Sequence, residues 1–124
     1  MNAINWFEIP ATDLERAYDF YYSILSGKVK KGTFGNGELV LFDVPFNSGE
    51  AVGGSIVVRE NFVPTAGGAM IYLNAFGPLS EATNKVESSG GQVLVPFMDL
   101  GKFGFASIII DSEGNRIGLL SNER

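Results

Sequence analysis

The sequence predicts an α+β fold in which two βαβββ modules form paired curved mixed sheets around a cup, with the helices outside. The first observation behind this prediction is a pair of apolar trios, sixty-five positions apart, that share the helical spacing i, i+3, i+7: Leu14, Ala17 and Tyr21, then Leu79, Ala82 and Val86. The second is that each trio follows an apolar strand-like run and precedes a glycine and a β-branched run. We therefore expect a duplicated unit whose functional site lies between its two copies.

The first module is expected over about residues 3–59, beginning with a strand at residues 4–9. A helix then continues to about Leu25, because Thr12 and Glu15 have the spacing of a capping box at its start. Three further strands are predicted, the first two joined by a glycine-rich turn at residues 35–37: 28–34, 38–44 and 53–59.

A linker rich in proline and glycine covers about residues 60–68, and the second module follows over about residues 69–121. It repeats the order of the first module, with a strand at 69–76, a helix from about 79 to 88, and strands at 91–96, 103–110 and 116–121. The 124 residues are thus predicted to form a single domain, which is long enough to bury a proper core.

Composition excludes several classes of function. The chain has no His and no Cys, the residues that most often ligate transition metals or act as catalytic base and nucleophile. Its net charge is −5, and Lys28, Lys30 and Lys31 form its only basic cluster, so we expect no nucleic-acid partner. We see neither a signal peptide nor an apolar run that could span a membrane, and the absence of cysteine fits a reducing compartment. The expectation is a cytoplasmic protein.

Two stretches resemble a known superfamily. The stretch from Ile9 to Tyr21 is similar to the first strand–helix signature of the vicinal oxygen chelate superfamily, which includes glyoxalase I, extradiol dioxygenases and bleomycin resistance proteins. The stretch from Asp111 to Leu120 resembles its last turn and strand. The resemblance covers about residues 3–121 and implies the paired βαβββ fold, but a shared fold does not set the reaction.

The resemblance also implies where metal-dependent members place their ligands, in the first and last strands of each module. Here those positions are held by Trp6, Ile71, Gly118 and Ser55, with Gly54 as an alternative to Ser55. Tryptophan, isoleucine and glycine offer no side-chain ligand to a metal ion. We therefore expect that the metal centre of the superfamily is lost, and we expect no cofactor.

Strand alternation indicates which side chains share a face with those positions. For Phe105 and Ser107 it allows either the cup or the side of the helix, and we favour the cup. The predicted pocket is apolar and aromatic with few polar groups, as small-molecule sites commonly are. The predicted ligand-binding residues are Trp6, Glu8, Ser55, Val57, Ile71, Leu73, Phe105, Ser107 and Gly118.

Trp6 and Glu8 each have two interpretations. Trp6 is either a large core side chain with a satisfied indole N–H or a platform on which a planar ligand stacks. Glu8 on an apolar concave face would be desolvated, which would suit it to act as a general base. Alternatively, Glu8 pairs with Arg59 or Arg116, or lies at a solvated rim.

Three aspartates are expected to be structural, namely Asp43, Asp99 and Asp111, and Asp111 is predicted to accept backbone N–H bonds in its own turn. A hard-metal site built from Glu8 with Asp43 or Ser55 remains an alternative. The apolar loop at residues 96–103 is interpreted as a cover over the cup, as a lid or as a dimer contact.

Three functions compete. The one we favour is a metal-free protein that holds an apolar or aromatic small molecule in the cup between the modules, as resistance-type relatives sequester drugs. The alternatives are a metal-free enzyme that uses Glu8 as its base, and a metal-dependent lyase or dioxygenase of the glyoxalase type. We expect a homodimer, because two-fold pairing is the commonest association, and neither nucleic acid nor a membrane as a partner.

Overall fold

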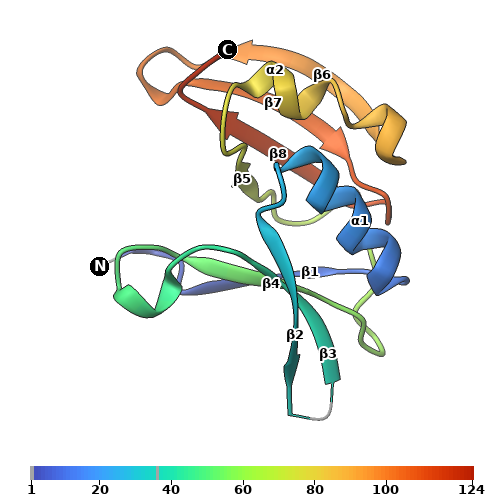
Figure 1. Cartoon of the computed structure of the whole chain (residues 1–124). Coiled ribbons are helices and arrows are strands. Elements are labelled where there is room, and N and C mark those ends of the chain that lie inside the picture. Colours follow the sequence, from blue (N-terminus) through green and yellow to red (C-terminus); the bar gives the residue numbers. More distant parts are fainter. Residues whose placement is uncertain (1, 36) are drawn as a thin grey trace.

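The computed structural model describes residues 2–35 and 37–124. Within these residues the strands form two four-stranded mixed sheets, which lie at the bottom and the top of Figure 1. The first sheet has the strand order β1-β4-β3-β2 and consists of β1 (Trp6–Pro10), β2 (Val29–Phe34), β3 (Gly37–Phe42) and β4 (Gly53–Val57). The second has the order β5-β8-β7-β6 and consists of β5 (Tyr72–Asn74), β6 (Gln92–Asp99), β7 (Phe105–Ile110) and β8 (Arg116–Ser121).

The two sheets have the same pairing pattern. In each, the first strand of the module runs parallel to the last, and the other neighbouring strands are antiparallel. One helix precedes the second strand of each module: α1 (Leu14–Ile24) in the first and α2 (Leu79–Thr83) in the second. The predicted α+β fold of two βαβββ modules is confirmed.

Helix α1 lies between the two sheets (Figure 1) and buries one stripe of side chains. These are Ala17, Phe20, Tyr21 and Ile24, whose spacing of three or four residues places them on one face. Gly27, with a φ of 78°, follows the helix as predicted. Among the described residues, no helix has the length and hydropathy needed to cross a membrane.

The N-terminus of α1 is capped differently from the prediction. Asp13 is the N-cap residue, and its carboxylate accepts a 3.0 Å hydrogen bond from the backbone N–H of Arg16. The predicted capping box of Thr12 and Glu15 is wrong. The hydroxyl and backbone N–H groups of Thr12 instead donate to the carboxylate of Glu113, about a hundred residues away.

The second module is less regular than the sequence predicts. Helix α2 ends at Thr83, and a short 3₁₀ turn, η2 (Glu87–Ser89), replaces the last part of the predicted helix. Strand β5 ends before Phe76, which has a left-handed φ of 57°. Strand β6 continues into the loop predicted at residues 96–103, and the 3₁₀ turn η3 (Gly101–Phe103) follows it.

One hydrophobic core joins the two modules. The helix-facing side chains of both sheets belong to a single cluster, among them Ile9, Val40, Ile56, Leu73, Ile109 and Leu119. The helices contribute to the same cluster, since α1 packs against β2, β3 and β4 and also contacts α2 and η2. Each sheet therefore turns one side toward this core. We name the other sides the outer faces of the first and the second sheet.

Candidate functional site

The outer face of the first sheet carries a cavity of about 420 Å³, which we name the first-sheet pocket. It is lined by residues of the first module, namely Trp6, Glu8, Thr33, Phe34, Leu39, Leu41, Phe46 and Ser55. Glu8 and Leu41 are the ladder partners of Ser55 on its two sides. Trp6, Glu8 and Ser55 thus share one face, as strand alternation predicts. Val57, two residues beyond Ser55 in β4, is buried on this face.

Trp6 forms one wall of the first-sheet pocket. Its ring meets that of Phe46, from the 3₁₀ turn η1 (Phe46–Ser48), edge to face, with the centroids 5.2 Å apart. Its indole N–H donates a 3.4 Å hydrogen bond to the hydroxyl of the buried Ser55. The side chain is nonetheless 38% exposed. Trp6 is therefore held in place and still presents aromatic surface, which differs from a fully buried core tryptophan.

Glu8 pairs with a cation at the rim of the pocket. Its carboxylate forms an ion pair with the guanidinium of Arg59, and the two side chains are 37% and 52% exposed. The Arg59 guanidinium also lies over the ring of Phe62, 5.4 Å from its centroid. Of the interpretations that the sequence left open for Glu8, the structure contains the pairing with Arg59, and the pair lies at a partly solvated rim.

The outer face of the second sheet carries Tyr72 and Gly118 at its β5 edge, where they are ladder partners. A Cβ atom on Gly118 would lie 2.3 Å from the ring of Tyr72, so this ring rests directly on the glycine. Ile108 pairs with Gly118 from the other side. Tyr72 was not among the predicted site residues, although it occupies the outer face beside Gly118.

The predicted position of Ile71 is wrong. The final ladder pairs, Pro10–Val57 and Asn74–Leu120, show that Tyr72 is the counterpart of Glu8. The connection from strand to helix is one residue longer in the second module than in the first, so counting back from the helix shifts the position by one. Ile71 packs against the core instead.

Three further predicted site residues face the helix side rather than the outer face. Ser107 is fully buried, and its hydroxyl hydrogen-bonds to that of Thr83 in α2 at 3.1 Å. Leu73 belongs to the core cluster, and Phe105 packs against it while its ring stacks on Phe97. The cup-facing orientation predicted for Phe105 and Ser107, and the position predicted for Leu73, are therefore wrong.

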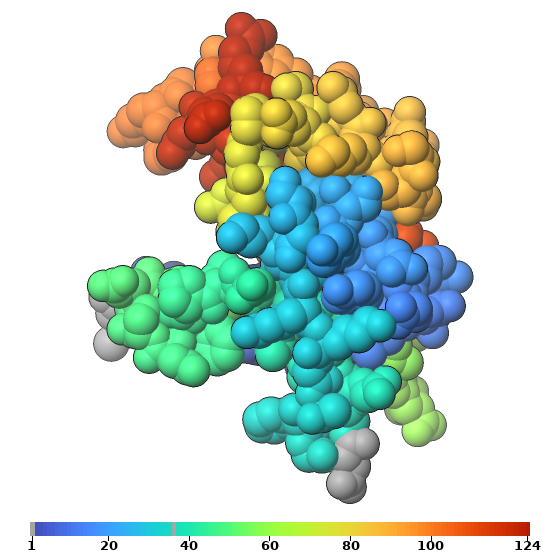
Figure 2. Space-filling view, in the orientation of Figure 1, coloured from blue at the N-terminus to red at the C-terminus, as the bar shows by residue number. Residues whose placement is uncertain are grey.

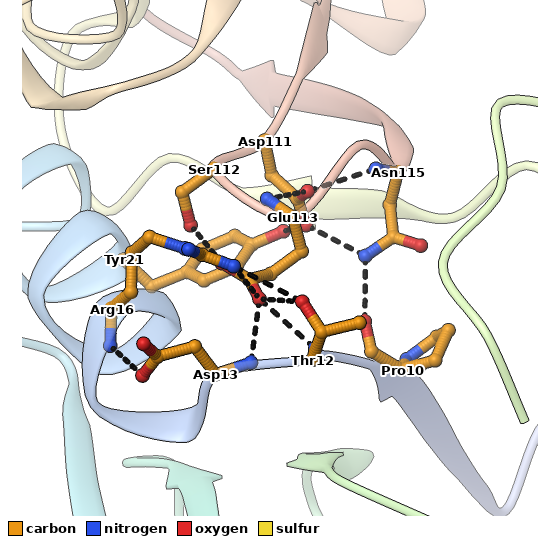
Figure 3. A network of polar contacts seen from close by, with 9 residues as sticks. All are labelled: Pro10, Thr12, Asp13, Arg16, Tyr21, Asp111, Ser112, Glu113 and Asn115. Atoms are coloured by element: carbon orange, nitrogen blue, oxygen red, sulfur yellow. Dashed lines mark hydrogen bonds and ion pairs between the residues drawn. The ribbon is translucent and has the colours of Figure 1, made fainter.

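A polar network ties the second module to the first (Figure 3). The buried Asp111 accepts hydrogen bonds from the hydroxyl of Tyr21 at 2.6 Å and from the side-chain amide of Asn115 at 2.9 Å. It also accepts from the backbone N–H groups of Glu113 and Asn115, which confirms the predicted turn role of Asp111. The Asn115 amide further donates to the carbonyl of Pro10 in β1, at 2.8 Å.

Glu113 forms the second part of this network. Its carboxylate accepts from the backbone N–H groups of Thr12 and Asp13, at 3.0 and 2.9 Å, and forms a 2.7 Å ion pair with Arg16. Burial alone would raise the pKa of Glu113, but the bonds from Arg16, from these two N–H groups and from Ser112 lower it to about 2. Sequence reasoning missed Glu113, because no local pattern marks a cap supplied from a distant turn.

The family comparison decides the relationship of this chain to known proteins. A family model described as Glyoxalase/Bleomycin resistance protein/Dioxygenase superfamily matches residues 3–119. The chain belongs to this superfamily. Among curated proteins, none matches the chain significantly.

Solved structures share the fold of this superfamily member at low sequence identity. A glyoxalase/bleomycin resistance protein from Albidiferax ferrireducens is 21% identical, with a TM-score of 0.69 over 96% of this chain and 98% of that one. A glyoxalase-related enzyme from Fulvimarina pelagi is 14% identical, with a TM-score of 0.68 over 97% and 88%. The trypanothione-dependent glyoxalase I of Leishmania major is 15% identical, with a TM-score of 0.67 over 98% and 88%. These likenesses show the fold alone.

The residues at the metal positions implied by the superfamily do not fit a metal ion. Trp6 offers only an N–H donor, and the space beside Gly118 is filled by the ring of Tyr72. The ladder pairs move the position predicted at Ile71 to Met70, whose thioether suits soft metal ions rather than the hard or borderline divalent ones. Ser55 alone supplies an oxygen, and one hydroxyl does not make a metal site. In residues 2–35 and 37–124, no group of three or more His, Cys, Asp or Glu side chains converges as a set of ligands would.

Proposed function

We propose that this chain is a metal-free binding protein that holds an apolar or aromatic small molecule at the outer face of the first sheet. The observation that supports it is the first-sheet pocket, whose volume of about 420 Å³ lies within the range of small-molecule sites. Its walls are mostly aromatic and aliphatic, with Trp6, Leu41 and Phe46 among them. Ser55 and the Glu8–Arg59 pair supply the few polar contacts that would orient a ligand.

The nature of the metal positions supports the metal-free part of the proposal. A lyase or dioxygenase of the glyoxalase type needs metal ligands that Trp6 and Gly118 lack. The alternative of a metal-free enzyme needs Glu8 free to take a proton, whereas its carboxylate is already paired with Arg59. Of the three functions, binding without catalysis is the one that requires neither a metal ligand nor a free catalytic base.

We further propose that the protein works as a homodimer in the cytoplasm. In one chain the outer faces that bear Trp6 and Tyr72 belong to different sheets, whose other sides share the core. Strands β1 and β5 are the terminal strands of their sheets, and a second cavity of about 630 Å³ lies at the seam between the modules. Figure 2 shows the hollow between the green and the yellow segments. A second copy of the chain, related by a two-fold axis and docked at this seam, would place its β5 beside β1 of the first copy. The two chains together would then complete the cup.

The binding proposal is tested with 8-anilinonaphthalene-1-sulfonate (ANS), a fluorescent probe of apolar sites. We expect saturable binding of about one probe per chain, accompanied by quenching of Trp6, the only tryptophan. Leu41→Asn, inside the first-sheet pocket, should weaken binding, whereas Tyr22→Asn, on the exposed side of α1, should not. Failure of the folded wild-type protein to bind, or equal effects of both substitutions, would refute the proposal.

The dimer is tested independently by sedimentation. The wild-type protein should sediment at twice the chain mass, and Ile4→Glu, at the seam, should shift it to the single-chain mass. Ile4 is 57% exposed in the single chain, so the fold itself should tolerate this change. A monomer at concentrations where ANS binds would contradict the dimer but leave the binding proposal intact.

A further inference from the structure

The outer face of the second sheet holds an aromatic ring in an unusual setting. Tyr72 and Gly118 are direct ladder partners, and a Cβ atom on Gly118 would lie 2.3 Å from Cδ2 and 2.6 Å from Cε2 of the Tyr72 ring. Gly118 is buried, whereas Tyr72 remains 46% exposed. The ring therefore lies on the backbone of β8 and presents its remaining surface to the exterior.

The first sheet repeats this arrangement with a larger ring. Trp6 and Gly53 are also ladder partners in a parallel pair, and a Cβ atom on Gly53 would lie 3.0 Å from Cζ3 of the Trp6 indole and 3.0 Å from Cβ of Phe46. Trp6 is 38% exposed. Each module thus sets one aromatic ring on a glycine of its last strand, on the side of the sheet that faces away from its helix.

A ring held against a glycine differs from a loose surface aromatic. The strand backbone blocks one face of the ring and limits its rotamers, so little conformational freedom remains to be lost when a ligand covers the other surface. Aromatic rings prefer partners that stack or meet edge to face, and a planar aromatic ligand satisfies that preference better than a saturated one of the same size. Two such rings point to a ligand with an extended π system.

We propose that Tyr72, seated on Gly118, is a second aromatic platform of the ligand site, and that the ligand is a planar aromatic molecule contacting both Trp6 and the partner's Tyr72. This inference rests on the binding function and the dimer proposed above. It adds a residue from the second module and narrows the ligand class from apolar molecules in general to planar aromatic ones. The phenol hydroxyl of Tyr72 supplies a polar contact at the edge of the ligand.

The test compares two competitors that displace ANS from the protein: 2-naphthol, which is planar, and decahydro-2-naphthol, its saturated counterpart. The wild-type protein should bind 2-naphthol more tightly. Tyr72→Ala should weaken the affinity for 2-naphthol by about tenfold, which corresponds to the loss of one stacking contact. It should change the affinity for decahydro-2-naphthol by no more than about twofold. Tyr72→Phe should keep most of the preference for the planar competitor, because it retains the ring.

Two controls separate this inference from the proposed function. Tyr22→Ala removes another exposed tyrosine, 51% exposed on α1, and should leave both competitors unchanged. If ANS binds the wild-type protein but Tyr72→Ala affects the two competitors equally or not at all, the platform is refuted while the binding function stands. If ANS fails to bind the wild-type protein, the binding function itself fails.

The contribution of the partner is tested by mixing variants. Trp6→Ala and Tyr72→Ala each damage every site in their own dimers. A mixed dimer of the two has one site with both substitutions and one site with neither. We expect co-refolded mixtures to regain 2-naphthol binding in up to about a quarter of all sites, since half of the dimers are mixed and half of their sites are intact. No recovery in mixtures shown to contain mixed dimers would overturn the assignment of Tyr72 to the partner.

Discussion

The hydroxyl of Tyr21 in α1 donates a 2.6 Å hydrogen bond to the carboxylate of Asp111, in the turn before β8. The bond joins the helix of the first module to the last hairpin of the second, inside the shared core. Burial, then the charge of Asp111 and this bond, raise the pKa of Tyr21 well above its usual range. Tyr21 therefore stays protonated and acts as a permanent donor between the modules.

Tyr21→Phe should destabilise the protein by about 1–3 kcal/mol, because it removes a donor from a buried carboxylate while keeping the packing of the ring. The free energy of unfolding in urea measures this effect. Tyr22→Phe is the matched control, since Tyr22 is 51% exposed, and it should change stability by less than about 0.5 kcal/mol. Equal stability of the two variants would contradict the role of the Tyr21–Asp111 bond.

The pKa of Glu113 makes stability depend on pH in acid. Its folded-state pKa of about 2 lies below an ordinary value of 4.5, so its contribution is fully present above about pH 4.5 and is lost as the pH falls toward 2. We expect Glu113→Gln to cost about 2 kcal/mol at neutral pH, allowing for screening of the half-exposed Arg16 partner. The variant should also lose stability less steeply than the wild type between pH 4.5 and 2.

Urea unfolding at several pH values measures both effects of Glu113→Gln. Glu15→Gln serves as the control, because Glu15 makes a surface ion pair with Lys31 in which both side chains are more than half exposed. It should leave the slope of stability against pH close to that of the wild type. If the free energy of unfolding of Glu113→Gln changed with pH as steeply as that of the wild type, the ionised Glu113 would not stabilise the start of α1.

Asn115→Asp should destabilise the protein more than Tyr21→Phe or Glu113→Gln, by about 3 kcal/mol or more. The Asn115 amide donates to both Pro10 and Asp111, and its carbonyl accepts from the backbone N–H of Thr65. An aspartate would lose both donated bonds and bring a second carboxylate against the buried Asp111. Thermal and urea unfolding measure the loss, with Asn122→Asp at an exposed position as the control. A variant as stable as the wild type would contradict the assigned amide orientation.

The order of elements could be predicted because the buried helix stripes repeat. Ala17 and Tyr21 in α1, and Leu79, Ala82 and Val86 in the second module, are all buried as their spacing indicates. Local boundaries were less predictable where tertiary contacts override propensity. The start of α1 is an example, because the N–H groups of Thr12 and Asp13, which immediately precede the helix, donate to Glu113 near the far end of the chain.

The candidate site could be predicted only where polar and apolar residues alternate clearly enough to distinguish the two faces of a strand. In β1 the polar Glu8 beside the apolar Ile9 distinguishes the two faces, and Trp6, Glu8 and Ser55 do meet at one pocket. In β7 apolar residues occupy both faces, so the pattern could not tell that Ser107 faces the helix. Ile71 was misplaced because the length of an intervening turn cannot be read from residue types.

Divalent transition metals should not stabilise the wild-type protein. Trp6 and Gly118, at two of the positions where the superfamily is expected to ligate a metal, offer no side-chain ligand. We expect the melting temperature to stay unchanged as Ni²⁺, Zn²⁺ or Mn²⁺ is raised to millimolar concentration. Stabilisation that increases with metal concentration would follow from binding to the folded state and would contradict the metal-free proposal.

Gly118→Ala tests whether Tyr72 occupies the space beside Gly118, where the superfamily is expected to place a metal ligand. The added methyl group would lie 2.3 Å from the Tyr72 ring, so the ring must move off β8. We expect a loss of about 1–3 kcal/mol in the free energy of unfolding, together with a changed tyrosine signal in near-ultraviolet circular dichroism. Gly67→Ala is the control, because its nearest atom, the Thr65 hydroxyl oxygen, lies 3.7 Å from an added Cβ. In a Tyr72→Ala background the cost of Gly118→Ala should largely disappear, since the residue that it displaces is gone. An unchanged cost would mean that Tyr72 is not what excludes a side chain at position 118.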